Sequence, residues 1–266
     1  MFINIVCLLC LLVSCHNSVK TDTEKTEADI PQQEKELKKI ADAHPDSMLL
    51  KENLIQYYRD NKNYGEGIKA VDQFIKKDTS NDHLYDIKGQ MYFLNHDTLN
   101  SIKAYEKAID INPDPMYVIA LGTMYAQTKN PLALEMSDAL LQAPTAKAQM
   151  YAVFIKGLYY NYTGEYAKAI SFFNGCNKMD YTFPDAYIEK TIALSKLGKY
   201  DDALKVTEQL ISLDHSFADG YYWRGYCFEK LNKKDDAIEN YKLALQLDPE
   251  YIEAKDALGK MGASIE

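Results

Sequence analysis

The feature that constrains this chain most is an internal repeat with a period of 34 residues, which recurs over most of its 266 residues. Self-similarity at a fixed period of this length is the signature of stacked structural units, each too small to bury its own apolar face. The units lie near residues 48–81, 82–114, 115–149, 150–183, 184–217 and 218–251. The chain is therefore expected to fold as one array of stacked units.

The last unit shows most clearly what each repeat contains. Small residues and rings stand at fixed places in it: Gly225 at the eighth, Phe228 at the eleventh, Ala237 at the twentieth, Tyr241 at the twenty-fourth, Ala244 at the twenty-seventh and Pro249 at the thirty-second. Two antiparallel helices that cross closely at the eighth and twentieth places explain this pattern, because the side chains must be small there. A ring at the eleventh place then fills the space beside the crossing.

The same places carry similar residues in the other units. The eighth place holds Gly89, Gly122 and Gly157. The twentieth place holds Gly67, Ser101, Ala169 and Ala203, and the eleventh holds Tyr58, Tyr92, Tyr125 and Tyr160. Turns are expected at Asn63-Tyr64, Gly164-Glu165-Tyr166 and Gly198-Lys199-Tyr200, where the first helix of a pair should stop. The pattern predicts one helix-turn-helix per unit.

This pattern resembles the tetratricopeptide repeat family. The resemblance implies an all-α fold, a right-handed α-solenoid of about six helix-turn-helix repeats that occupies residues 34–266. Residues 34–44 are expected to form an N-terminal capping helix, and residues 251–262 a C-terminal one, because the ends of an array must shield its core from water. The third unit departs from the pattern. Pro131 and Pro144 bound its second helix, which predicts a shorter helix followed by a longer connection over Thr145–Gln149.

The first residues resemble the signal peptide of a bacterial lipoprotein. A short apolar run from Ile5 to Val13 is too short to span a membrane, which takes about 20 apolar residues. The following Leu12-Val13-Ser14-Cys15 resembles a lipobox, in which Cys15 would become the lipidated first residue. We therefore expect a signal peptide over 1–14 and a protein held at the cell envelope by lipid, on the outer membrane or the periplasmic face. An uncleaved anchor or a plain signal peptide is the alternative.

The segment that follows Cys15 is polar and charged, and 15–33 is expected to be a tether because it has too few apolar side chains to fold. The whole chain has a net charge of −9. Such a charge repels phosphate backbones, so we expect no nucleic-acid partner.

No motif for nucleophilic, metal or phosphate chemistry stands in the sequence, so we expect no cofactor, no metal and no enzymatic activity. His83, with Asp86 and Gln90 on one helix face, is a loose candidate that fits a solvated polar face better than a site. Cys176 and Cys227 are predicted to be unpaired, because helices two units apart are too distant for a disulfide.

The family resemblance implies that the second, fifth, ninth and twelfth places of the first helices line a concave groove. Acidic and amide residues at these places in the first two units, such as Glu52 and Asp86, do not fit the lysine and asparagine with which chaperone-binding members hold a carboxylate. The central and C-terminal units are apolar and aromatic there. The predicted partner-binding residues are Met116, Ile119, Phe154, Leu158, Ile188, Ile192, Tyr222 and Tyr226.

We expect a non-enzymatic scaffold or adaptor that binds a partner peptide or helix in this groove. The alternative is a lipid-anchored protein that captures a glycan for an outer-membrane transporter, for which stacking rings such as Tyr222, Trp223 and Tyr226 would serve. That design usually carries large insertions, which this sequence lacks.

Overall fold

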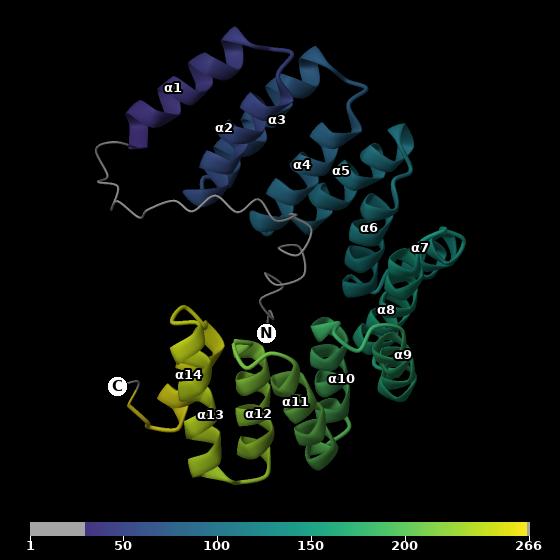
Figure 1. Cartoon of the computed structure of the whole chain (residues 1–266), viewed down its shortest axis with the longest axis vertical. Helices are drawn as coiled ribbons and strands as arrows, with labels where there is room; N and C mark the ends of the chain where they lie inside the picture. Colours follow the sequence, from purple (N-terminus) through teal and green to yellow (C-terminus); the bar gives the residue numbers. More distant parts are fainter. Residues whose placement is uncertain (1–29, 265–266) are drawn as a thin grey trace. The chain divides into compact units, whose positions relative to one another are not determined.

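A computed structural model describes residues 30–264 of the chain, and these residues form fourteen helices joined by short turns (Figure 1). The helices are α1 (Ile30–Ala43), α2 (Met48–Asp60), α3 (Tyr64–Lys77), α4 (Asp82–Leu94), α5 (Thr98–Ile111), α6 (Pro115–Gln127), α7 (Leu132–Leu141), α8 (Ala146–Tyr162), α9 (Tyr166–Met179), α10 (Pro184–Lys196), α11 (Tyr200–Leu213), α12 (Ala218–Lys230), α13 (Lys234–Leu247) and α14 (Ile252–Lys260). The described range contains no strand, which confirms the predicted all-α fold.

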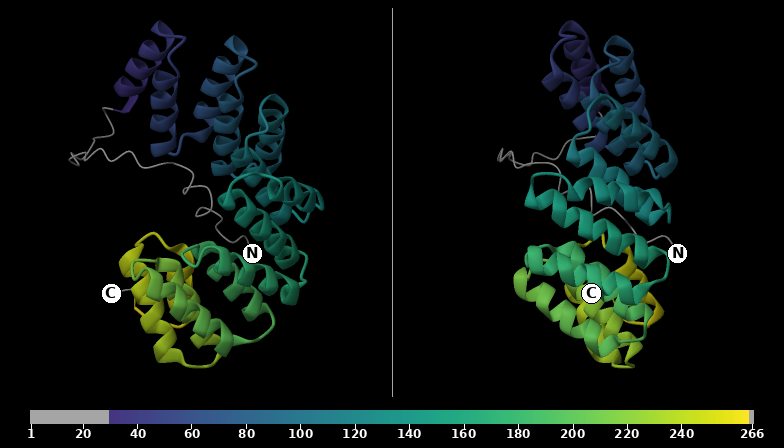
Figure 2. Two further views of the ribbon diagram at one scale, coloured as in Figure 1. Left: turned by 45° about the vertical axis from the view of Figure 1, so that its right-hand side comes forward. Right: turned by 90° about the vertical axis from the view of Figure 1, so that its right-hand side faces the viewer.

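The helices group into two compact units, unit 1 up to Leu121 and unit 2 from Gly122 onward, and each is described by itself. From α1 to α5 in unit 1, and from α7 to α14 in unit 2, each helix packs against the next one in the chain (Figure 2). We call α2, α4, α6, α8, α10 and α12 the first helices of the repeats, and α3, α5, α7, α9, α11 and α13 the second helices. Helix α1, which precedes the repeats, packs on α2, and helix α14, which follows them, packs on α13.

Within a repeat, the first helix ends in the same hydrogen-bonded turn every time. The residue at the fifteenth place has a positive φ angle in all six repeats: Lys62, His96, Lys129, Gly164, Gly198 and Asn232. The next N–H group then donates to the carbonyl of the eleventh residue, as from Asn63 to Tyr58 at 2.8 Å and from Lys233 to Phe228 at 2.9 Å. This is the Schellman motif, which satisfies carbonyl groups at the end of a helix and reverses the chain.

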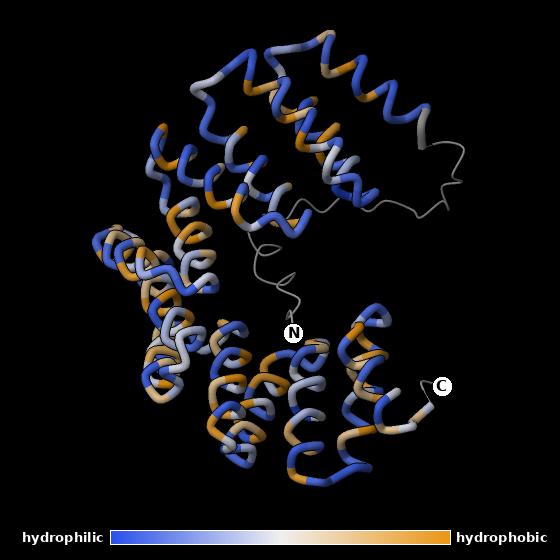
Figure 3. The backbone as a smooth tube through the Cα atoms, turned by 180° about the vertical axis from the view of Figure 1, so that it is seen from behind, coloured by the Kyte–Doolittle hydropathy of each residue, from blue (hydrophilic) through white to orange (hydrophobic). Residues whose placement is uncertain are grey.

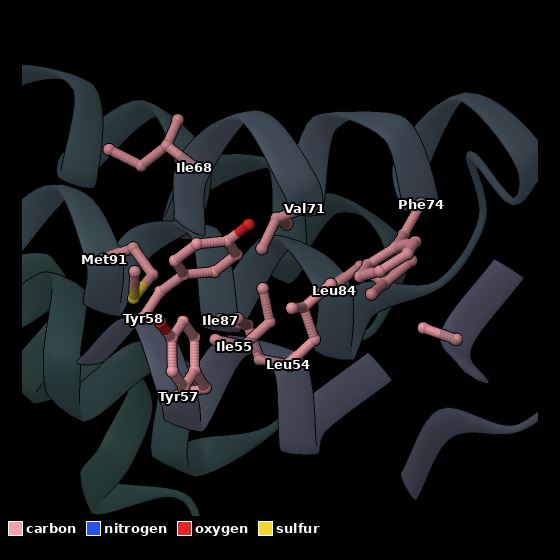
Figure 4. Packing of buried hydrophobic residues seen from close by; sticks show 11 residues of the cluster. Leu54, Ile55, Tyr57, Tyr58, Ile68, Val71, Phe74, Leu84, Ile87 and Met91 are labelled. Carbon is pink, nitrogen blue, oxygen red and sulfur yellow. The ribbon is translucent and has the colours of Figure 1, made fainter. Parts of the chain in front are cut away.

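The core of unit 1 lies between α2, α3 and α4, where apolar side chains of the three helices meet (Figure 4). Leu54, Tyr58 and Val71 are among its buried members. Hydrophobic and hydrophilic residues alternate along the helices over about one turn, as amphipathic helices require (Figure 3). Burial of one apolar face therefore holds each helix against its neighbours.

The eighth-place glycines make room for a ring, which refines the predicted crossing. A Cβ atom on Gly157 would lie 2.5 Å from the ring of Phe173, and one on Gly89 would lie 2.6 Å from the ring of Tyr105. Both rings stand at the twenty-fourth place of their repeats. At Gly225 the ring of Tyr241 would be 2.9 Å away and the carbonyl oxygen of Ala237 3.2 Å. The predicted contact with the twentieth place is thus present, but the ring comes closer.

Two predicted boundaries are wrong. Helix α1 begins at Ile30, so the end of the predicted tether over 15–33 is helical. Thr145–Gln149 was predicted as a long connection, but Thr145 caps α8 by accepting a hydrogen bond at 3.2 Å from the N–H of Ala148. Threonine is a good N-cap and alanine the best helix former, so this polar stretch starts a helix of 17 residues. The short second helix of that repeat is present as α7, with 10 residues.

The cysteines and the N-terminal segment are the remaining features that the sequence predicts. Cys176 and Cys227 are free thiols, as predicted, and both are buried. The predicted signal peptide over 1–14, Cys15 and most of the tether lie outside the described residues. Among residues 30–264, no helix is both long enough and apolar enough to cross a bilayer.

Candidate functional site

The surface of interest consists of the second, fifth, ninth and twelfth places of the first helices, which we call the first-helix face. In unit 1, side chains of α2 and α4 meet across this face, as in the hydrogen bond between Arg59 and Gln90. In unit 2, α10 contacts both α8 and α12, so the three first helices adjoin. The two units carry different chemistry on this face.

The face of unit 1 is a polar network centred on His83. Its Nε2 lies 2.8 Å from Oε1 of Glu52 on α2, and its Nδ1 lies 3.5 Å from Oδ2 of Asp86. Gln90 donates to Asp86 at 2.9 Å and accepts from Arg59 at 3.2 Å. Hydrogen bonding to Asp86 and Glu52 raises the pKa of His83 to about 9.

These side chains therefore pair with one another and join α2 to α4. In the part of the chain that the structure describes, no group of three or more His, Cys, Asp or Glu side chains could hold a metal ion. The network fits the predicted polar face, with the addition that its members are mutually hydrogen-bonded.

Unit 2 carries three neighbouring rings on α12, which we call the α12 aromatic surface: Tyr222 and Tyr226 on the first-helix face, and Trp223 beside them at the sixth place. All three are partly exposed. Ring centroids lie 5.3 Å apart for Tyr222 and Trp223, and 5.4 Å apart for Trp223 and Tyr226. The Nζ atom of Lys230 lies 4.9 Å from the ring centroid of Tyr226. These contacts restrain the three rings, each of which remains partly exposed to solvent.

A second layer of rings supports this surface from below. Tyr222 stacks on Tyr251 at 5.0 Å and contacts Tyr241 at 5.7 Å. The hydroxyl of Tyr251 donates to Asp219 at 2.6 Å, and that of Tyr241 donates to Glu229 at 2.9 Å. Tyr222 is therefore fixed by packing, whereas Tyr226 lies further out.

Half of the predicted partner-binding residues are too buried to contact a partner. Phe154 and Leu158 are completely buried, and Ile119 and Ile192 are 4% and 9% exposed. The reason is clear for Phe154, whose ring packs against Phe183 at 4.9 Å and Phe173 at 5.8 Å. These residues belong to the core, so their assignment to the partner-binding surface is wrong. Met116, Ile188, Tyr222 and Tyr226 are partly exposed.

Helix α10 also carries a carboxylate pair, Asp185 on the first-helix face and Glu189 at the adjacent sixth place, and neither residue was among the predicted partner-binding residues. Asp185 is 4% exposed, and burial, with the nearby charge of Asp219 as a smaller cause, raises its pKa to about 7. Burial also raises the pKa of Glu189 to about 7, against the lowering effect of a hydrogen bond from Asn161. Two acidic residues four apart on a helix with an otherwise apolar face were the signal available in the sequence.

Comparison with known proteins gives two matches to the tetratricopeptide repeat family model, at residues 82–115 and 218–251. No curated protein matches the chain in sequence.

Solved structures share the fold. A tetratricopeptide repeat protein from Parabacteroides merdae superposes with a TM-score of 0.73 at 19% identity, covering 89% of this chain and 93% of that one. PilW, a type IV pilus biogenesis factor, gives 0.61 at 19% identity, covering 79% and 97%. A chain of the Cut9–Hcn1 hetero-tetramer of the APC/C also gives 0.61, at 16% identity, covering 88% of this chain and 45% of that one.

At these identities the likeness concerns the fold. The matched repeats lie one in each unit, and further helix pairs with the same turn surround them. The chain therefore contains tetratricopeptide repeats at residues 82–115 and 218–251 and has the fold of a tetratricopeptide repeat solenoid.

Proposed function

We propose that this protein is a non-enzymatic scaffold that binds a segment of a partner protein on its first-helix face. The observation that carries the proposal is the α12 aromatic surface, where three rings are held in place and partly exposed. Large aromatic side chains dominate the energy of protein interfaces, because they bury much area and lose little conformational freedom on binding. Arrays of helical repeats use such extended faces for recognition.

Partly exposed Ile188 on the neighbouring helix α10 extends this surface with an aliphatic side chain. A partner segment that presents apolar or aromatic side chains fits this composition. Recognition by such a surface needs no bond-making chemistry, so the proposed activity is stoichiometric binding.

The proposal predicts that Tyr226→Ala weakens binding of the partner strongly. The Tyr226 ring contacts Trp223 and Lys230 at the outer edge of the surface, so its loss removes contact area without opening the core. Truncation of an interface hot spot typically costs about 2 kcal/mol or more, which is about thirtyfold in affinity. The measurement is the dissociation constant for a partner recovered by affinity purification from detergent-solubilised envelope.

Tyr181→Ala is the matched control, since Tyr181 is a tyrosine with 69% exposure that lies off the first-helix face, between α9 and α10. It should leave the affinity unchanged. If circular dichroism shows that wild type and Tyr226→Ala are both folded and their affinities are equal, the α12 aromatic surface does not bind the partner.

We further propose that a lipid on Cys15 holds the scaffold at the cell envelope, as the lipobox-like Leu12-Val13-Ser14-Cys15 suggests. Labelling of growing cells with radioactive palmitate should mark the wild-type protein and leave Cys15→Ala unmarked. Cys227→Ala supplies a control thiol in the folded part. Equal labelling of wild type and Cys15→Ala, or absence of label from both, contradicts the anchor.

A further inference from the structure

The carboxylate pair Asp185 and Glu189 occupies one side of α10, where α10 packs against α8 and α12. Residues four apart on a helix lie on the same face, about one turn from each other. From α8, the side chain of Asn161 donates a hydrogen bond to Oε2 of Glu189 at 2.7 Å. From α12, Asp219 adds a further negative charge near Asp185.

Two oxygen atoms at this place are buried and accept no hydrogen bond: Oδ2 of Asp185 and Oδ1 of Asn161. These side chains are only 4% and 7% exposed. A buried acceptor without a donor destabilises the folded state, and more strongly so when it is charged. The arrangement therefore has two unmet acceptors and a carboxylate pair in one location.

Within the described residues, no positively charged side chain forms an ion pair with these carboxylates. None of the ion pairs found among residues 30–264 includes Asp185 or Glu189. Lys190 stands next to Glu189 in the chain, but burial lowers the pKa of Lys190, and no carboxylate counteracts that effect. Tyr151, Tyr162 and Asp219 also interact electrostatically with the pair, and none of them is a cation.

A cation from outside the chain would complete the arrangement. A lysine ammonium has three donors and an arginine guanidinium five, which can serve a carboxylate pair and an amide oxygen together. A metal ion fits less well, since no three acidic, histidine or cysteine side chains are grouped to hold one in the described part of the chain.

We propose that one lysine or arginine side chain of the partner segment binds at Glu189, which is partly exposed, and reaches the buried Asp185 beside it, next to the α12 aromatic surface. This inference rests on the proposed function and specifies the chemistry of the partner. Adjacent packed helices lie about 8–10 Å apart, and an extended segment advances about 3.3 Å per residue. The partner should therefore carry its basic residue two to three positions from an aromatic or large apolar residue.

Selection of displayed random dodecapeptides on the detergent-solubilised full chain tests this inference. It is carried out at pH 8, above the pKa of about 7 of both carboxyl groups. The wild type should enrich peptides with a basic residue at the stated spacing from a ring or large apolar residue. The variant D185N/E189Q should still enrich apolar peptides but lose the preference for the basic residue. The control D201N/D202N removes the same charge from exposed positions of the second helix α11, and should select like the wild type.

A selected peptide and its analogue with norleucine in place of the basic residue then measure the pairing directly. Replacement of the basic residue should weaken binding to the wild type at least tenfold and leave binding to D185N/E189Q unchanged, as a double-mutant cycle requires for a direct contact. Enrichment of apolar peptides without a basic residue, or equal losses in both proteins, overturns the inference while the proposed function stands. If none of the proteins enriches any peptide, both the proposed function and this inference are overturned.

Discussion

Gly157→Ala is expected to destabilise the protein by about 1–3 kcal/mol, although alanine is the better helix former. The added Cβ would lie 2.5 Å and 2.8 Å from two carbon atoms of the Phe173 ring. That ring cannot retreat easily, because Phe173 is completely buried and packs against Phe154 at 5.8 Å. Thermal and urea denaturation followed by circular dichroism measures the loss, and Gly157→Val should lose more than Gly157→Ala.

Gly259→Ala is the matched control within the same unit. Gly259 also lies in a helix, α14, but a Cβ there would meet nothing within 4 Å. The same substitution should therefore stabilise the protein, by up to about 1 kcal/mol from helix propensity. Opposite signs for the two variants are the expected result. A stabilising Gly157→Ala would show that α8 and α9 do not cross as closely as described.

The second large effect concerns pH and the carboxylate pair on α10. The pKa of Asp185 is raised from 3.8 and that of Glu189 from 4.5, both to about 7. A carboxyl group whose pKa is higher in the folded state favours folding only while it is protonated. Its contribution is complete below pH 4 and is lost as the pH rises through 7. We expect the stability to fall between about pH 4 and pH 7, with the contribution of Asp185 amounting to at most about 4 kcal/mol.

The variant D185N/E189Q should show a much smaller fall over the same pH range and should be more stable than the wild type at pH 8. The comparison is needed because His83, with a pKa raised to about 9, also loses its contribution as the pH rises from 6.5. Asp185, with 4% exposure, should account for more of the effect than the partly exposed Glu189. Parallel pH profiles of variant and wild type would mean that the two carboxyl groups have ordinary pKa values.

The helix pairs could be predicted from the sequence because close packing of two helices requires small residues at fixed places of each repeat. Gly157 and Ala169 indicate a close crossing, and such small residues recur at the same places in other units. The turn after the first helix was predicted at Gly164 and Gly198, where glycine supplies the left-handed residue, and also at Asn63-Tyr64, where no glycine stands. Lys62 and Lys129 adopt the same conformation without glycine. The capping hydrogen bonds offset the steric strain there, and a single residue type does not reveal this.

The candidate site was harder to predict, because exposure at a given place depends on the neighbouring repeat. Phe154 and Tyr222 both stand at the fifth place, and both contact a ring at the thirty-fourth place, Phe183 and Tyr251 respectively. Phe154 is nevertheless completely buried, whereas Tyr222 is partly exposed. Periodicity assigns a residue to a helix face, but the packing between repeats decides how much of it reaches solvent.

Site-specific photocrosslinking in living cells tests most directly whether the first-helix face is the binding surface. Benzoylphenylalanine is placed at Tyr226 on the first helix α12, or at exposed Gln209 on the second helix α11. If the partner binds the first-helix face, the protein with the probe at Tyr226 is covalently joined to a distinct partner protein after irradiation, and the protein with the probe at Gln209 is not. Crosslinking to the same partner from Gln209 but not from Tyr226 would contradict the account and assign binding to the second helices.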